Sequence, residues 1–280
     1  MNIAVILAGG TGSRMGMVDR PKQFIEIYGK PVVIHTIEAF EINDSIDAIC
    51  VVCTKEWQED LSIWLKEYDV RKVRWIANAG SSRQESSLNA LNAIKDDVKE
   101  DDIIIIHDSA RPLISQRIIN ENIEKVKECG ACDTVIPSQD TVIRSLDGEY
   151  LDSIPARHEL YLGQTPQSFR YSIVRKAYDD YFALPEDKRP LMTDDCGLVL
   201  ASGIKIGMAM GDKLNMKMTT MEDLLIINLN TGQTLRLTTT YAQNYGSIFL
   251  AKFFKLFRRF QIPIKFELYA FCFQVHNLFN

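Results

Sequence analysis

Residues 1–16 read MNIAVILAGGTGSRMG, an apolar run followed at once by a glycine-rich segment. The run Ile3–Leu7 is apolar throughout, as expected for a strand of a parallel sheet covered on both faces. Gly9, Gly10 and Gly12 allow backbone amides to approach phosphate oxygens just beyond the carboxyl end of that strand. The segment therefore predicts an α/β protein that holds a phosphate-bearing ligand at the edge of its sheet.

Strand-like runs alternate with amphipathic stretches along most of the chain. The predicted strands are Ile3–Leu7, Ala48–Cys53, Val73–Ala77, Ile103–His107, Thr134–Pro137 and Ile204–Met210. The predicted helices are Pro31–Phe40, Glu56–Glu67, Ser82–Ile94, Arg117–Cys129, Ser172–Phe182 and Asp194–Ala201. This alternation predicts a doubly wound, mostly parallel sheet whose ligand lies at the carboxyl ends of the strands.

One stretch, residues 139–161, interrupts the alternation. It reads QDTVIRSLDGEYLDSIPARHELY and predicts two short strands around the turn Leu146-Asp147-Gly148. Such a hairpin would project from the parallel sheet as an arm, which suits a dimerisation or lid element.

Composition and charge describe an ordinary globular protein with an unusual end. The chain is 46% hydrophobic and 25% charged with a formal net charge of −5, so no nucleic-acid partner is expected. A short first apolar run and no stretch of transmembrane length predict a cytoplasmic protein. Residues 231–280 hold six basic residues, one acidic residue and 12 of the 26 aromatic residues. We expect an accessory or disordered extension there, in preference to a membrane-contacting helix around FLAKFFKLFRRF.

The cysteines include two Cys-x-x-Cys pairs, Cys50/Cys53 and Cys129/Cys132. A strand would send the first pair to opposite faces of the sheet, and the second flanks Gly130 at a helix end. Neither pair has a nearby His or acidic partner, so we expect no metal knuckle and no disulfide.

The glycine segment matches none of the common phosphate loops. No G-x-x-x-x-G-K-[ST] is present, and after Gly10-x-Gly12 the next glycine, Gly16, is one position too late for a dinucleotide fingerprint. The second predicted strand also ends in Thr54-Lys55, without the acidic residue that such a site needs. What remains is a glycine loop with Arg14 on it and Lys22 eight residues on, which suits a triphosphate attacked at its α-phosphorus.

Other motifs follow the later strands. Asp108 in IIIIHDSARP would lie at the active edge, where it could bind a ribose, a substrate hydroxyl or Mg²⁺, while His107 is interpreted as a structural donor. The segment AGSSRQESS, residues 79–87, offers donors for a nucleotide or makes an ordinary helix N-cap. Lys217 lies in NMKMTTMEDL, before a predicted helix, and Arg157 precedes GQTPQSF by six residues.

Together these blocks resemble the cytidylyltransferases of polyol and sugar-acid-like phosphates. LAGGTGSRMG…PKQF, SSRQESS, HDSARP, QTPQSF, TDD (Thr193–Asp195) and NMKMTTMEDL occur in the family's order and spacing over residues 1–230. The resemblance implies a Rossmann-like nucleotidyltransferase fold, CTP with Mg²⁺, and a homodimer in which the 139–161 arm carries Arg157 to the partner's site. Residues 231–280 lie outside it.

The resemblance also implies roles for individual residues. CTP would be bound by Leu7, Ala8, Gly9, Gly10, Thr11, Gly12, Gly80, Ser81, Ser82, Arg83, Ser86 and Ser87. The catalytic cations would be Arg14, Lys22 and Lys217, and the acceptor would be bound by Asp108, Arg157, Thr165 and Lys217. Asp108 is also the candidate metal ligand.

Two acceptors fit the resemblance, ribitol 5-phosphate and 2-C-methyl-D-erythritol 4-phosphate. The opening LAGG rather than AAG, and the block IPARHELYLGQTPQSF, favour ribitol 5-phosphate and hence CDP-ribitol for teichoic-acid or capsular polymers. The alternative acceptor belongs to non-mevalonate isoprenoid biosynthesis. A reductase is disfavoured because the chain has no second nucleotide-binding fingerprint, and a decayed regulator because Arg14, Lys22, Asp108, Arg157 and Lys217 are all present.

Overall fold

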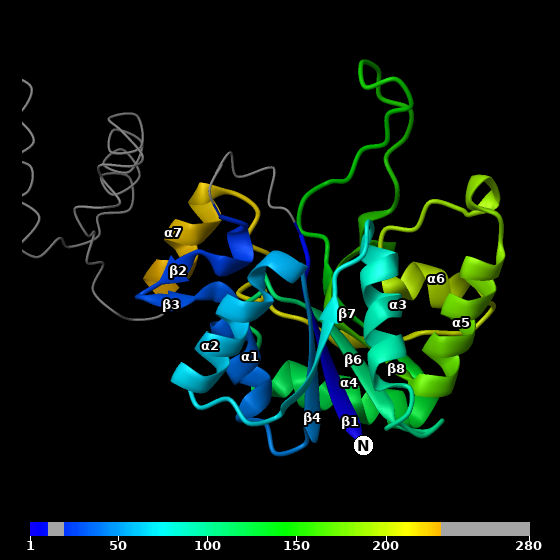
Figure 1. The fold of residues 1–280 in the computed structure, drawn as a ribbon. Helices are drawn as coiled ribbons and strands as arrows, with labels where there is room; N and C mark the ends of the chain where they lie inside the picture. Colours follow the sequence, from blue (N-terminus) through cyan, green and yellow to red (C-terminus); the bar gives the residue numbers. More distant parts are fainter. Residues whose placement is uncertain (11–19, 231–280) are drawn as a thin grey trace, which may run out of the picture. The chain divides into compact units, whose positions relative to one another are not determined.

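The computed structural model describes residues 1–10 and 20–230 of the 280-residue chain (Figure 1). Thr11, Gly12, Arg14 and the extension 231–280 lie outside the described residues, and so do the expectations stated for them. In the described part, no helix combines the length and the apolar character that crossing a membrane requires.

A seven-stranded mixed sheet organises residues 2–210. Its strands lie in the order β5 (Val73–Asn78), β4 (Ala48–Cys53), β1 (Asn2–Ala8), β6 (Ile103–Asp108), β8 (Tyr161–Arg170), β7 (Ala131–Pro137) and β9 (Gly207–Met210). Every strand pair is parallel except the two made by β8, which runs antiparallel to both β6 and β7. The predicted α/β fold with a mostly parallel sheet is confirmed. A separate small hairpin, β2 (Glu26–Ile27) with β3 (Lys30–Pro31), was not predicted.

Helices cover both faces of the sheet (Figure 1). One core packs side chains of α1 (Val32–Glu41), α2 (Gln58–Glu67) and α4 (Gln116–Cys129) against the sheet. The core on the other face includes side chains of α3 (Arg83–Ile94), α5 (Tyr171–Ala183) and α6 (Asp195–Ala201). Cys50 belongs to the second core and Cys53 to the first, so the two thiols point to opposite faces, as predicted. The remaining elements are α7 (Met221–Asn230) and the 3-10 helices η2 (Lys22–Phe24), η3 (Lys55–Trp57), η4 (Arg157–Glu159) and η5 (Glu186–Lys188).

Strand β8 was missed by the sequence prediction, which singled out GQTPQSF as a motif but did not include it among the strands. It contains Gly163 and Pro166, both unfavourable inside a strand, and Pro166 has no amide proton for the ladder. The pairing with β7 is irregular between Asp133 and Val135, and the Thr134 hydroxyl donates to the Pro166 carbonyl at 2.6 Å. A side-chain hydrogen bond and a register shift thus accommodate the proline in the sheet interior.

The arm between β7 and β8 extends away from the sheet (Figure 1). The prediction of two strands in residues 139–161 is wrong, because the segment holds only an isolated antiparallel bridge between Arg144 and Ser153 before β8 begins. The predicted turn is present: Gly148 has φ 81°, and the Asp147 carboxylate accepts from the Glu149 and Tyr150 amides. A solvated hairpin without a third strand or a covering helix is marginal, so its ladder does not extend.

Candidate active site

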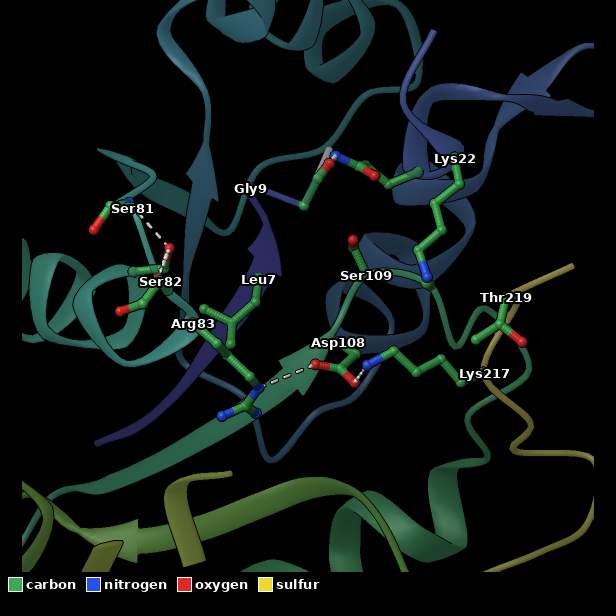
Figure 2. Close-up of a pocket in the computed structure, with 15 residues that line it drawn as sticks. Leu7, Gly9, Lys22, Ser81, Ser82, Arg83, Asp108, Ser109, Lys217 and Thr219 are labelled. Carbon is green, nitrogen blue, oxygen red and sulfur yellow. Dashed lines mark hydrogen bonds and ion pairs between the residues drawn. The ribbon is translucent and has the colours of Figure 1, made fainter. Parts of the chain in front are cut away.

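A pocket of about 380 Å³ lies at the carboxyl ends of β1, β5 and β6 (Figure 2). Because β1, β5 and β6 point the same way, their carboxyl ends meet at one edge of the sheet. The segment before α7, which is distant in sequence, supplies the lining residues Lys217 and Thr219. Its described lining residues are Leu7, Gly9, Gly10, Lys22, Gln23, Gly80, Ser81, Ser82, Arg83, Ser86, Asp108, Ser109, Ala110, Lys217 and Thr219.

The start of the glycine loop is held by two close contacts. A Cβ on Gly9 would come within 2.4 Å of the Ala79 Cβ, so only glycine lets β1 and the loop after β5 approach so closely. The buried Gln23 side chain donates to the carbonyls of Ala8 at 2.7 Å and Gly10 at 2.8 Å. These bonds tie η2, which also carries Lys22, to the end of β1.

Lys22 connects pocket segments that lie far apart in the sequence. Its ammonium group points into the pocket (Figure 2). It donates to the Met218 carbonyl at 2.8 Å, a contact across 196 residues of sequence. Lys217 is the neighbour of Met218, so the backbone before α7 places two lysines at the same end of the pocket.

The loop Gly80–Ser82 is shaped by the helix that follows it. Ser82 is the N-cap of α3 and accepts from the Glu85 amide at 3.0 Å, while Glu85 accepts from the Ser81 amide at 2.7 Å. These reciprocal bonds resemble a capping box, and the bonds from Ser81 lower the Glu85 pKa. The Gly80 amide donates to Ser86 Oγ at 3.0 Å. The loop is therefore fixed before any ligand binds.

Asp108 lies among three cations. Its Oδ2 accepts from Lys217 Nζ at 2.7 Å, and its Oδ1 lies 3.7 Å from Arg83 Nε (Figure 2). Oδ2 also lies 3.9 Å from Arg111 Nε. Burial by itself would raise the pKa of the Asp108 carboxyl, but Arg83, Lys217 and Arg111 outweigh burial and hold it well below its usual range. Asp108 is therefore ionised at every pH at which the protein is expected to work.

His107 and Thr165 support Asp108 from inside the sheet. The Asp108 amide donates to Thr165 Oγ1 at 3.1 Å, and the Thr165 hydroxyl can then donate to His107 Nδ1 at 3.0 Å. This leaves the ring proton on Nε2, which donates to the Arg111 carbonyl at 3.2 Å. Burial lowers the pKa of His107 to about 4, so the ring is neutral near pH 7. These contacts agree with the predicted structural role of His107.

The described residues fit poorly as a protein metal site. Asp108 is the single carboxylate among the described residues that line the pocket, and cations face both its oxygens. The described part of the chain holds no group of three or more His, Cys, Asp or Glu side chains that could bind a metal ion. A metal at this edge would need most of its oxygen ligands from a bound phosphate chain.

Most of the predicted site residues in the described part come together at this pocket. Ala8 and Ser87 are instead fully buried behind it, and Thr165 lies beneath Asp108. Arg157 is exposed in η4, where it donates to the Gln139 carbonyl at 3.2 Å, and it does not line the pocket.

Several pocket residues were missed by the sequence prediction. Gln23, Ser109, Ala110 and Thr219 line the pocket, and Arg111 contacts Asp108. All lie inside quoted motifs, PKQF, HDSARP and NMKMTTMEDL. The motifs could therefore have indicated these residues, but the sequence prediction assigned roles to only some residues of each motif.

The charges of the lining favour a polyanion. Among the described lining residues, the cations Lys22, Arg83 and Lys217 outnumber the one carboxylate, Asp108. Beside a glycine-rich strand end on a doubly wound sheet, an excess of fixed positive charge suits phosphate-bearing substrates. The fold and the charges of the site are those expected of a nucleotidyltransferase.

Comparison with known proteins identifies the family within this class. The family model of IspD, 2-C-methyl-D-erythritol 4-phosphate cytidylyltransferase, matches residues 2–231. The chain is 40% identical over 228 residues to the ribitol-5-phosphate cytidylyltransferase of Lactiplantibacillus plantarum, covering 81% of this chain and 96% of that protein. The chain therefore belongs to the IspD family and is a cytidylyltransferase.

Solved structures of the family have the same fold. The 4-diphosphocytidyl-2C-methyl-D-erythritol synthase of Anaerococcus prevotii superposes with a TM-score of 0.70 at 26% identity, covering 83% of this chain and 98% of that one. The 2-C-methyl-D-erythritol 4-phosphate cytidylyltransferase of Francisella tularensis gives 0.69 at 29% identity, covering 81% and 98%.

Proposed function

We propose that this enzyme transfers CMP from CTP to ribitol 5-phosphate, giving CDP-ribitol and pyrophosphate. The observation that carries this choice is the 40% identity to a ribitol-5-phosphate enzyme over 228 residues, against 26% and 29% to the two solved methylerythritol-phosphate enzymes. The alternative acceptor, 2-C-methyl-D-erythritol 4-phosphate, is supported by the name of the family model.

The reaction is an in-line displacement at the α-phosphorus of CTP. A phosphate oxygen of the acceptor forms the new bond to the α-phosphorus, the bond to the bridging oxygen breaks, and pyrophosphate leaves with that electron pair. The attacking phosphate is already an anion, so no general base is needed. The obstacle is the repulsion between two polyanions, which fixed cations and positioning overcome.

The pocket offers a role for each of its two lysines. Lys22 would stabilise the charge on the transferring phosphoryl group together with Arg14, which lies outside the described residues. Lys217 would hold the acceptor phosphate, and the ionised Asp108 would accept a hydrogen bond from an acceptor hydroxyl. The contact of Lys22 with the Met218 carbonyl supports this division, because it brings Lys22 next to the Lys217 segment.

The two loops would divide CTP between them. Leu7–Gly12 would hold the triphosphate, and residues 80–87 would hold the cytidine. Ala8 and Ser87, fully buried, would support these loops from behind rather than touch the nucleotide.

Magnesium would enter as part of the substrate, Mg·CTP. A single pocket carboxylate surrounded by cations would bind a free Mg²⁺ ion weakly. The phosphates of CTP provide the oxygen ligands that Mg²⁺ prefers. Asp108 as a direct metal ligand is accordingly the weaker of its two predicted roles.

The arm would form a homodimer interface. Five apolar arm residues are each more than half exposed: Ile143, Leu146, Tyr150, Leu151 and Ile154. Exposed apolar side chains on a projecting segment favour burial against a second copy. If each subunit packs its arm against the other subunit, Arg157 would reach the pocket of the partner.

The wider setting follows from the product. CDP-ribitol made in the cytoplasm would serve as a donor for teichoic-acid or capsular polymers, and residues 1–230 would form the catalytic unit. The test is to supply Mg·CTP with each acceptor in turn and follow pyrophosphate and the diphosphate product by ³¹P NMR. CDP-ribitol is expected, whereas CDP-methylerythritol alone would establish the alternative and no product with either would refute both.

A further inference from the structure

A buried carboxylate that the proposed chemistry does not use lies beneath the pocket. Asp195, at the start of α6, is 0% exposed. Its Oδ1 accepts from the hydroxyls of Ser87, at 2.8 Å, and Tyr178. Its Oδ2 lies 2.6 Å from Arg83 Nη1. A buried charge is costly unless it is paired, and Arg83 supplies the opposite charge to Asp195 inside the protein.

Arg83 lies between two carboxylates. Its guanidinium group is 2.6 Å from Asp195 through Nη1 but 3.7 Å from Asp108 through Nε, and its side chain is only 22% exposed. Burial would lower the pKa of Arg83, but Asp195 and then Asp108 outweigh burial and raise it. Asp195 is thus the principal counter-ion of Arg83, and Asp108 is the secondary one.

This division of contacts affects Asp108. With Asp195 as its main partner, Arg83 stays at 3.7 Å and leaves Oδ1 of Asp108 without a close hydrogen-bonded cation. If Asp195 lost its charge, Asp108 would be the remaining carboxylate within reach of Arg83. The planar guanidinium would then be drawn onto Asp108 in a close pair.

We propose that Asp195 is a positioning residue: it holds Arg83 away from Asp108 and so keeps Asp108 Oδ1 available for a hydroxyl of the acceptor. This inference rests on the proposed function, in which Asp108 binds the acceptor. In this account Arg83 pairs closely with Asp195 and only at longer range with Asp108, in addition to any contact with CTP.

The test compares three variants on the acceptor that the wild-type enzyme uses. Asp195→Asn keeps the side-chain shape and an oxygen for the two hydroxyls, but it removes the charge and can turn an amide donor toward Arg83. The KM for the acceptor should rise about tenfold, while the KM for Mg·CTP changes less than about threefold. Tyr178→Phe is the matched control, since it removes a hydrogen bond to the same carboxylate without altering any charge. It should lower the melting temperature and leave the acceptor KM unchanged.

The double variant Arg83→Met/Asp195→Asn distinguishes positioning from packing. It removes both buried charges, so it is charge-balanced and should fold even if Asp195→Asn alone does not. Arg83 also lines the pocket proposed for CTP, so the acceptor KM is measured at saturating Mg·CTP. With no guanidinium from Arg83 to pair with Asp108 Oδ1, the acceptor KM should return to within about threefold of wild type. An unchanged acceptor KM in Asp195→Asn, a double variant no better than the single one, or equal effects of Asp195→Asn and Tyr178→Phe would overturn the proposal. A wild-type enzyme inactive with both acceptors would instead refute the proposed function, and this inference with it.

Discussion

Replacement of Asp108 by Asn tests the electrostatics of the pocket, because it removes one charge and keeps the side-chain size. Lys217, Arg83 and Arg111 lie 2.7, 3.7 and 3.9 Å from the carboxylate oxygens. At an effective dielectric constant of about 20, two charges about 4 Å apart attract by about 4 kcal/mol. Lys217 is 36% exposed and Arg83 retains Asp195, so we expect a net destabilisation of about 2 kcal/mol. For a domain of this size that lowers the melting temperature by about 4–8 °C.

The same substitution separates two roles of Asp108. If Asp108 binds an acceptor hydroxyl and no metal, its replacement by Asn removes a negative charge from the pocket without weakening any contact to Mg·CTP. Mg·CTP should then bind about 3–10 times more tightly by calorimetry in 0.1 M salt. The kcat/KM for the acceptor should fall about 10–100-fold, because a hydrogen bond to a charged group is lost. Asp187→Asn, at an exposed position in η5, is the control for charge alone. Weaker Mg·CTP binding that excess Mg²⁺ restores would make Asp108 a metal ligand and refute this reasoning.

Three further predictions concern Lys22, Asp133 and residues 231–280. Lys22→Ala should lower kcat about 10²–10³-fold while the Kd for Mg·CTP changes less than about threefold, and equal losses in both would rule out a transition-state role. Burial raises the pKa of Asp133 to about 6, so its contribution to stability is present below pH 4 and lost as the pH rises through 6. Asp133→Asn should therefore gain at most about 3 kcal/mol over wild type in urea unfolding at pH 7.5 and nothing at pH 4, and a gain equal at both pH values would contradict this. Deletion of residues 231–280 should leave CDP-product formation intact, which loss of soluble enzyme would refute.

Regular elements were predictable from the sequence where periodicity and burial agree. The strand predicted at Ala48–Cys53 has those bounds in the structure, and Ser82 is the N-cap of the helix predicted to begin with it. The strand predicted at Ile204–Met210 begins later, at Gly207. Strand β8 was missed because Gly163 and Pro166 oppose strand formation locally, and tertiary pairing with β6 and β7 overrides them.

The site was predictable in part for a related reason. Asp108 and the glycine loop follow apolar strands, so parallel topology alone brings them together. The contact between Lys22 and Met218 spans 196 residues, and Arg83 meets Asp195 from a different helix. No local pattern encodes such pairs. The family's motifs placed Lys22 and Lys217 in one site, but they gave no signal that Asp195 is the main counter-ion of Arg83.

The acceptor proposed for this pocket is ribitol 5-phosphate. The most direct measurement is the ratio of kcat/KM for ribitol 5-phosphate to that for 2-C-methyl-D-erythritol 4-phosphate, from pyrophosphate release at saturating Mg·CTP. Because buried polar groups discriminate strongly between hydroxyl patterns, we expect a ratio of at least about 10². A ratio near one or below it would contradict the claim.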